Sequence, residues 1–176
     1  DRPRGGAAAA VKAMRDLGLA VELLSGDDDD VVQQTALRVG ISLARGRADP
    51  EAKARRVAEL VGSGRRVLFV GDGLNDGPAL AAASVGVAMG SGAAASVSVA
   101  DGVLVGEGLD ALVRGIGVAR RARTVVAQSS RRAIVYNVVA VGLAAAGLVN
   151  PLVAAISMPL SSALVVTTAS RVGRAA

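Results

Sequence analysis

The sequence predicts an α/β fold with a parallel sheet, followed by two membrane-spanning helices. Over about the first 115 of the 176 residues, helix-like and strand-like segments alternate along the chain. Strands that are separated by helices usually lie parallel and are joined by right-handed crossovers. After residue 115 the alternation gives way to long apolar runs. The hydrophobic content of 52% also exceeds what one soluble domain usually needs.

The individual elements follow from apolar periodicity and from the punctuating glycine and proline residues. We expect helices over residues 7–18, 31–40, 50–64 and 78–83. We expect strands over residues 19–24, 67–70, 85–89 and 101–105. Pro50 stands at the start of the third helix, where its missing N–H is tolerated. This order assigns residues 1–115 to one α/β domain.

The second part of the chain changes from basic to apolar. Residues 116–132 have the pattern of a basic, amphipathic connecting helix, and a run of about 17 residues without formal charge follows. Asn150 and Pro151 interrupt it, and a second run of similar length ends before Arg171. At about 1.5 Å per residue each run spans roughly 25–28 Å, near the lower limit for a bilayer. We therefore expect a transmembrane hairpin over 133–170; a buried helical pair in a soluble protein is the alternative.

The charge distribution indicates a lipid partner and no nucleic acid. The net charge is +5, but aromatic residues that could stack on bases make up only 1% of the chain. Arginines flank the apolar runs instead: Arg120, Arg121, Arg123, Arg131 and Arg132 before them, and Arg171 and Arg174 after them. Positive residues favour the inner face of a membrane, so we expect a multi-pass protein of the cell (plasma) membrane with its α/β domain in the cytoplasm. The absence of Cys and His excludes disulfides, thiolate nucleophiles and histidine bases.

The stretch VLFVGDGLND, residues 67–76, places acidic side chains directly after a predicted strand. Ligands of parallel α/β sheets bind outside the carboxyl ends of the strands, where Asp72 and Asp76 would stand. Carboxylates on a glycine-rich turn suit Mg²⁺, which prefers oxygen ligands, and Asn75 adds an amide that can donate to a phosphoryl oxygen. The alternative is an Asx-turn that only closes the strand.

A second strand end supplies further groups that suit a phosphate. Ser25, Gly26 and Asp27 follow the strand over 19–24, and a hydroxyl with exposed backbone N–H groups can hold phosphate oxygens. Lys53 lies early in the helix that Pro50 begins, and its ammonium can neutralise phosphoryl charge; the alternative is a solvated helix residue. These groups together suit phosphoryl transfer but lack the nucleophile.

The motifs SGD, P-x-x-K, GDGLNDGPAL and VGVAMGSG, in this order, resemble the second half of the phosphorylation domain of P-type ATPases, a haloacid dehalogenase-like (Rossmannoid) fold. The resemblance covers essentially the whole chain. It implies that Asp72 and Asp76 support the catalytic Mg²⁺ and that Lys53 contacts the aspartyl phosphate formed from ATP. It also implies that Ser25 and Gly26 correspond to the family's TGD element.

The segment after the α/β part resembles the heavy-metal-transporting branch, in which the chain ends two helices after the phosphorylation domain. Copper members carry YN and M-x-x-S-S in these helices, and the matching residues here are Tyr136, Asn137, Met158, Ser161 and Ser162. Polar groups in a spanning helix are costly unless they line a pathway, and a Met thioether is a soft ligand suited to Cu⁺. The alternative is that they only pack the helices. Ser129 and Gly142 stand where copper members have Asn and Pro, which leaves the metal open.

The resemblance therefore implies the C-terminal portion of an ATP-driven heavy-metal cation transporter, exporting Cu⁺ through an aspartyl phosphate. The phosphorylated aspartate lies outside this chain, so the missing N-terminal part of the pump is an expected partner and the isolated chain is expected to be inactive. Three alternatives stay open: a Zn²⁺ or Cd²⁺ pump of the same branch, a membrane-anchored haloacid dehalogenase-type phosphatase, and a truncated, non-catalytic remnant. The sequence leaves the direction of transport and the oligomeric state open.

Overall fold

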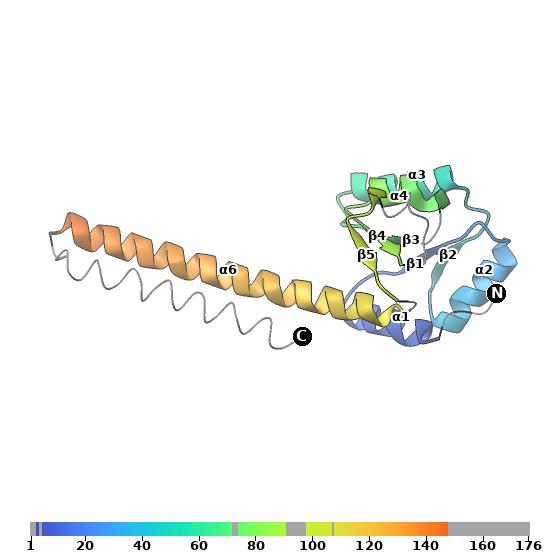
Figure 1. Ribbon diagram of the computed structural model, residues 1–176, viewed down its shortest axis with the longest axis horizontal. Helices are drawn as coiled ribbons and strands as arrows, with labels where there is room; N and C mark the ends of the chain where they lie inside the picture. The colour runs from blue at the N-terminus through green and yellow to red at the C-terminus, as the bar shows by residue number, and fades with distance from the viewer. Residues whose placement is uncertain (1–2, 4, 72–73, 91–97, 107, 148–176) are drawn as a thin grey trace. The chain divides into compact units, whose positions relative to one another are not determined.

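The computed structural model describes the chain except for residues 1–2, 4, 72–73, 91–97, 107 and 148–176. The chain divides into two compact units, Asp1–Val113 and Arg114–Ala176. The first unit contains the alternating helices and strands, and the described part of the second consists almost entirely of one helix (Figure 1).

The first unit confirms the predicted α/β alternation. Its elements are α1 (Ala7–Asp16), β1 (Glu22–Leu24), α2 (Asp29–Val39), β2 (Leu43–Arg45), α3 (Pro50–Gly62), β3 (Leu68–Gly71), the 3-10 helix η1 (Leu74–Asp76), α4 (Gly77–Ala82), β4 (Val85–Met89) and β5 (Gly102–Leu104). Each predicted helix and strand is present within a few residues of its expected bounds. β2 was not predicted, because its three residues carry no apolar alternation and two of them are exposed.

The strands pair in parallel, as expected, but they form two sheets. β1 pairs with β2, with Glu22 opposite Leu43, and the other sheet has the order β3-β4-β5, with Leu68 of β3 opposite Val85 of β4. Among the described residues no backbone ladder joins the two sheets. The prediction of parallel pairing is confirmed, but the prediction of a single sheet was wrong for the described residues. β1 and β3 would have to pair to make one sheet, and each instead keeps one edge that no described strand covers.

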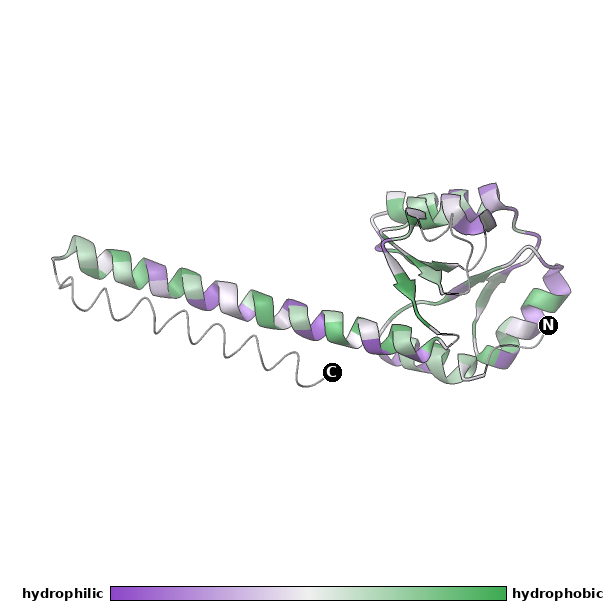
Figure 2. Ribbon diagram, viewed as in Figure 1, coloured by the Kyte–Doolittle hydropathy of each residue, from purple (hydrophilic) through white to green (hydrophobic). Residues whose placement is uncertain are grey.

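Helices cover the strands, and small side chains fill the core. Figure 1 shows α3 and α4 together on one side of the strands and α1 and α2 on the other. Val11 of α1 packs with Ala36 and Val39 of α2 and with Ile41 in one buried cluster, and Leu23 of β1 lies against it. Figure 2 shows β3, β4 and β5 mainly in the colours of hydrophobic residues. Burial of these apolar groups stabilises the layered arrangement that positions the loops after β1 and β3.

In the second unit, α6 (Asp110–Ala145) is a continuous helix of 36 residues that begins just before the unit boundary. It includes the whole predicted connecting helix, 116–132, and most of the first predicted apolar run. Within the described ranges, none of the helices combines the length and the apolar character that a membrane crossing requires. Residues 148–170 of the predicted hairpin lie outside the described part of the chain.

Candidate functional site

A buried ion pair lies at the carboxyl end of β3. Nζ of Lys53 donates a hydrogen bond of 2.8 Å to Oδ1 of Asp76, and the two side chains are only 15% and 10% exposed. Asp76 ends η1, and Lys53 lies in the first turn of α3. Burial removes both charges from water, and the attraction between them compensates for the lost hydration. The pair therefore fixes the first turn of α3 against the turn that follows β3.

Gly71, the last residue of β3, allows Asp76 to occupy this position. A Cβ atom on Gly71 would lie 2.7 Å from both Cβ and Oδ2 of Asp76. Real Cβ atoms essentially never approach other atoms so closely. The Asp76 side chain therefore packs directly over the backbone of Gly71.

The start of α3 is held beside the loop that follows β1. Oδ1 of Asp49 accepts a hydrogen bond of 2.6 Å from the backbone N–H of Ala52, which caps the helix. The N–H of Ala48 donates to the backbone oxygen of Ser25 at 2.9 Å. Because Lys53 lies one turn further along α3, the loops after β1 and β3 both contact the amino end of this helix.

Ser25 and Asp27 contact each other in the loop after β1. Oγ of Ser25 donates to Oδ2 of Asp27 at 3.0 Å and accepts from the N–H of Asp27 at 3.3 Å. Gly26, between them, is exposed. The hydroxyl and the amides that the sequence predicts for phosphate binding therefore share one compact turn, and Asp27 orients the hydroxyl.

The acidic run that continues from Asp27 holds the loop after β2. Oδ1 of Asp29 accepts from the N–H of Gly46 at 2.8 Å, and Oδ1 of Asp28 accepts from Nε of Arg47 at 3.0 Å. A Cβ atom on Gly46 would lie 2.7 Å from the backbone of Asp29. These contacts fix the start of α2 against the segment that follows β2. In the sequence, the glycine between Arg45 and Arg47 was the feature that could have indicated a close backbone approach here.

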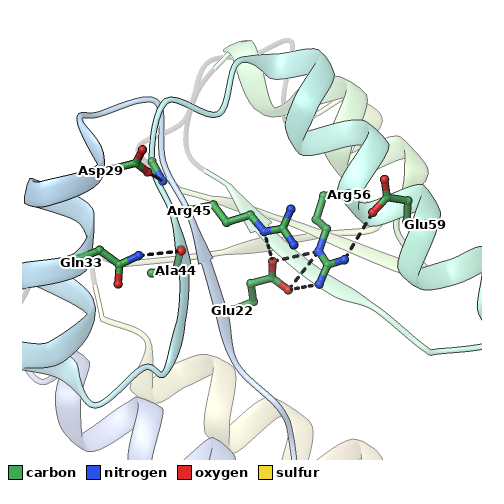
Figure 3. Close-up of polar contacts among 8 residues, drawn as sticks. Glu22, Asp29, Gln33, Ala44, Arg45, Arg56 and Glu59 are labelled. Atoms are coloured by element: carbon green, nitrogen blue, oxygen red, sulfur yellow. Dashed lines mark hydrogen bonds and ion pairs between the residues drawn. The ribbon is translucent and has the colours of Figure 1, made fainter.

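A group of charged side chains that the sequence analysis did not identify joins β1 to α3 (Figure 3). Nε and Nη2 of Arg56 each donate to the Glu22 carboxylate at 3.0 Å, in the two-pronged geometry typical of arginine. Arg45 of β2 lies 3.5 Å from Glu22, and Glu59 accepts from Arg56 at 3.4 Å. Donation to Glu22 raises the pKa of the Arg56 guanidinium above its ordinary value, and Glu59 adds to this. A lone glutamate inside an apolar strand was the sign that could have revealed the group.

The other predicted site residues are only partly placed. Asn75 is exposed in η1; Asp72, the predicted magnesium partner of Asp76, lies outside the described residues. Among those that are described, no group of three or more His, Cys, Asp or Glu side chains could hold a metal ion. Of the residues predicted for the transported metal, Tyr136 is half-buried and Asn137 is exposed, both on α6. Met158, Ser161 and Ser162 lie outside the described part.

Comparison with known families and proteins gives a consistent result. A family model of haloacid dehalogenase-like hydrolases matches residues 1–84. The nitrogen fixation protein FixI of Rhizobium leguminosarum bv. viciae is 44% identical over 171 residues, which are 97% of this chain and 22% of that protein. A copper-exporting P-type ATPase of Mycobacterium tuberculosis is 40% identical over the same share of each chain. The chain thus spans about a fifth of the length of these relatives.

Solved structures give the same result for the fold. The crystal structure of a zinc-transporting PIB-type ATPase superposes with a TM-score of 0.92 at 28% sequence identity. The match covers 98% of this chain and 28% of that one. In sequence and in fold, the chain therefore corresponds to a part of a heavy-metal-transporting P-type ATPase, and its α/β unit is haloacid dehalogenase-like.

Proposed function

We propose that this chain forms half of the phosphorylation site, and part of the metal pathway, of an ATP-driven heavy-metal pump. The observation that carries the proposal is the buried Lys53–Asp76 pair, at 2.8 Å, beside the Ser25 loop. A buried cation beside a carboxylate at the end of a parallel strand is suited to a phosphoryl group and its metal ion. The relatives that match nearly all of this chain include a copper-exporting P-type ATPase.

The residues of the site have distinct roles in this proposal. Lys53 neutralises the phosphoryl oxygens, while the N–H of Gly26 and the Ser25 hydroxyl, once it turns from Asp27, hold the same group from the other loop. Asp76, with Asp72, offers carboxylate oxygens, which are the donors that Mg²⁺ prefers. When bound, Mg²⁺ would supply further neutralisation of phosphoryl charge. The Asp76 carboxylate is oriented for this role by its contact with Lys53.

The nucleophile belongs, in this proposal, to a segment outside the chain. In the part of the chain that the structure describes, β1 and β3 each have an edge without a strand partner. Open strand edges are ready to pair with another extended segment. A strand that pairs there would end beside the loops after β1 and β3, which is where an aspartate must lie to receive the γ-phosphoryl of ATP.

The transported ion is proposed to cross a plasma membrane along the second unit. Large apolar side chains of α6 are exposed over the predicted first span: Ile134, Val135, Val138, Val139 and Val141. An exposed apolar surface of this kind suits lipid. Cu⁺ is the first candidate, because Met158 supplies a soft thioether. Zn²⁺ is the second candidate, because a zinc-transporting ATPase gives the structural match with the TM-score of 0.92.

The test is phosphorylation of the full-length protein by γ-labelled ATP in membranes, with added Cu⁺ or Zn²⁺. We expect an acid-stable, hydroxylamine-sensitive phosphoprotein whose formation depends on one of these ions and is lost in Asp76→Asn. The alternative of a haloacid dehalogenase-type phosphatase would be supported by a different result. In that case the protein would hydrolyse a simple phosphate ester in the absence of both metal ions, and no phosphoprotein would form from ATP. Failure to form any phosphoprotein in a folded, ATP-binding protein would support the non-catalytic remnant.

A further inference from the structure

Helix α3 contacts both sheets of the α/β unit through two side chains on one face. Lys53 and Arg56 are three residues apart, so they project from the same side of the helix. Lys53 reaches Asp76 at the end of β3, whereas Arg56 reaches Glu22 in β1. Since no backbone ladder joins the two sheets among the described residues, these side chains tie one sheet to the other through α3.

The contact between Glu22 and Arg56 is well suited to fixing the helix. Both side chains are largely shielded from water, at 17% and 23% exposed. Two donor nitrogens of the planar guanidinium meet two carboxylate oxygens at 3.0 Å, and such a contact fixes orientation as well as distance. Arg45, across the β1–β2 pair, also lies against the Glu22 carboxylate (Figure 3). Rotation or sliding of α3 would break this contact.

We infer that the Glu22–Arg56 pair is a positioning device that holds the first turn of α3 so that Lys53 reaches Asp76. The pair itself touches neither the phosphoryl group nor the metal. Its consequence for catalysis rests on the proposed function, whereas its effect on the placement of Lys53 does not. A pair that merely stabilised the fold would leave the environment of Lys53 unchanged in the folded protein.

The chain contains two lysines, Lys12 and Lys53, and this allows a direct test. The Lys12 side chain is 76% exposed, against 15% for Lys53. Trace labelling of the folded chain with acetic anhydride, followed by peptide mass spectrometry, gives the ratio of the two labelling rates. Because both lysines are labelled in the same sample, the Lys12 rate corrects for differences in reagent concentration and in pH between experiments.

The variants are Glu22→Gln, Arg56→Gln and the double substitution, with Arg55→Gln as a matched control. Arg55 is the neighbouring arginine on α3, and its side chain is 66% exposed in a contact with Glu51. We expect both single variants to raise the Lys53/Lys12 labelling ratio roughly three- to tenfold, as residues coupled within one group of contacts do. The double variant should add nothing further, and Arg55→Gln should leave the ratio unchanged.

An unchanged ratio in both folded single variants would overturn the inference, even if their melting temperatures fell. Should either variant not fold, Glu22→Asp retains the charge but withdraws the carboxylate by one methylene, and the same rise in the ratio is expected. In the full-length protein, Arg56→Gln should slow phosphoprotein formation with little change in the KM for ATP. A wild-type protein that formed no phosphoprotein would refute the proposed function, while the labelling ratio would still decide the positioning role.

Discussion

Lys53 and Asp76 are 23 positions apart in the sequence, yet Nζ of one and Oδ1 of the other are 2.8 Å apart. Each comes from an element that the sequence predicts independently, a helix after Pro50 and a turn after the strand VLFV. Their contact joins the amino end of α3 to the turn at the carboxyl end of β3.

Substitution of Lys53 by Ala is expected to lower the free energy of unfolding by about 2–4 kcal/mol, because it leaves the buried Asp76 carboxylate without its lysine partner. Lys12→Ala is the matched control: Lys12 pairs with Asp16 at the surface, and loss of such a pair changes stability by about 1 kcal/mol or less. Urea denaturation followed by circular dichroism measures both. Equal effects of the two substitutions would show that the Lys53 pair is not buried as described.

Gly71→Ala is expected to displace the Asp76 carboxylate, since the new methyl group would lie 2.7 Å from its Oδ2. Overpacking of this kind destabilises by about 1–3 kcal/mol, and phosphoprotein formation should be lost in the full-length protein. Gly62→Ala, at the end of α3, is the control, because no atom within 4 Å would meet its Cβ. Retention of phosphorylation in Gly71→Ala would argue against a role for Asp76 at the site.

Asp49→Ala should cost about 1 kcal/mol of stability through loss of the N-cap of α3. The helix end that carries Lys53 should fray as a result, which would raise the rate of amide exchange at Ala52 and Lys53, whose N–H groups donate to Asp49. Asp28 provides the comparison, since it precedes α2 without making a side-chain cap hydrogen bond and its carboxylate pairs with the exposed Arg47. Asp28→Ala is therefore expected to change stability by about 0.5 kcal/mol or less.

Local patterns were sufficient to predict most elements of the α/β unit. β4 begins and ends at the predicted residues, Val85 and Met89, because an apolar run there is bounded by Ser84 and by Gly90. β2 was missed because Leu43–Arg45 is short and mostly exposed. Its strand conformation depends on pairing with β1, which no local pattern records.

The same distinction applies to the site. The motif order predicted that Ser25 and Asp76 lie in segments that follow strands, and the structure has Ser25 after β1 and Asp76 in the turn after β3. The Glu22–Arg56 contact was not predictable, because it joins residues 34 positions apart through the packing of α3 on β1. Nor did the sequence show that Asp29 would bind the amide of Gly46, since that contact requires the unpredicted β2.

The open edges of β1 and β3 lead to a prediction about hydrogen exchange. Strand amides without a ladder partner exchange quickly, whereas those paired within a sheet are protected. If a strand from elsewhere in the full-length protein pairs with these edges, those amides of residues 22–24 and 68–71 that point away from β2 and β4 should exchange more slowly there than in the 176-residue chain. β4 is the internal control: it is already paired with β3 and with β5, so its exchange should change little. Equal exchange of β1 and β3 in both proteins would mean that no strand covers these edges, and the aspartate would then have to reach the site by another route.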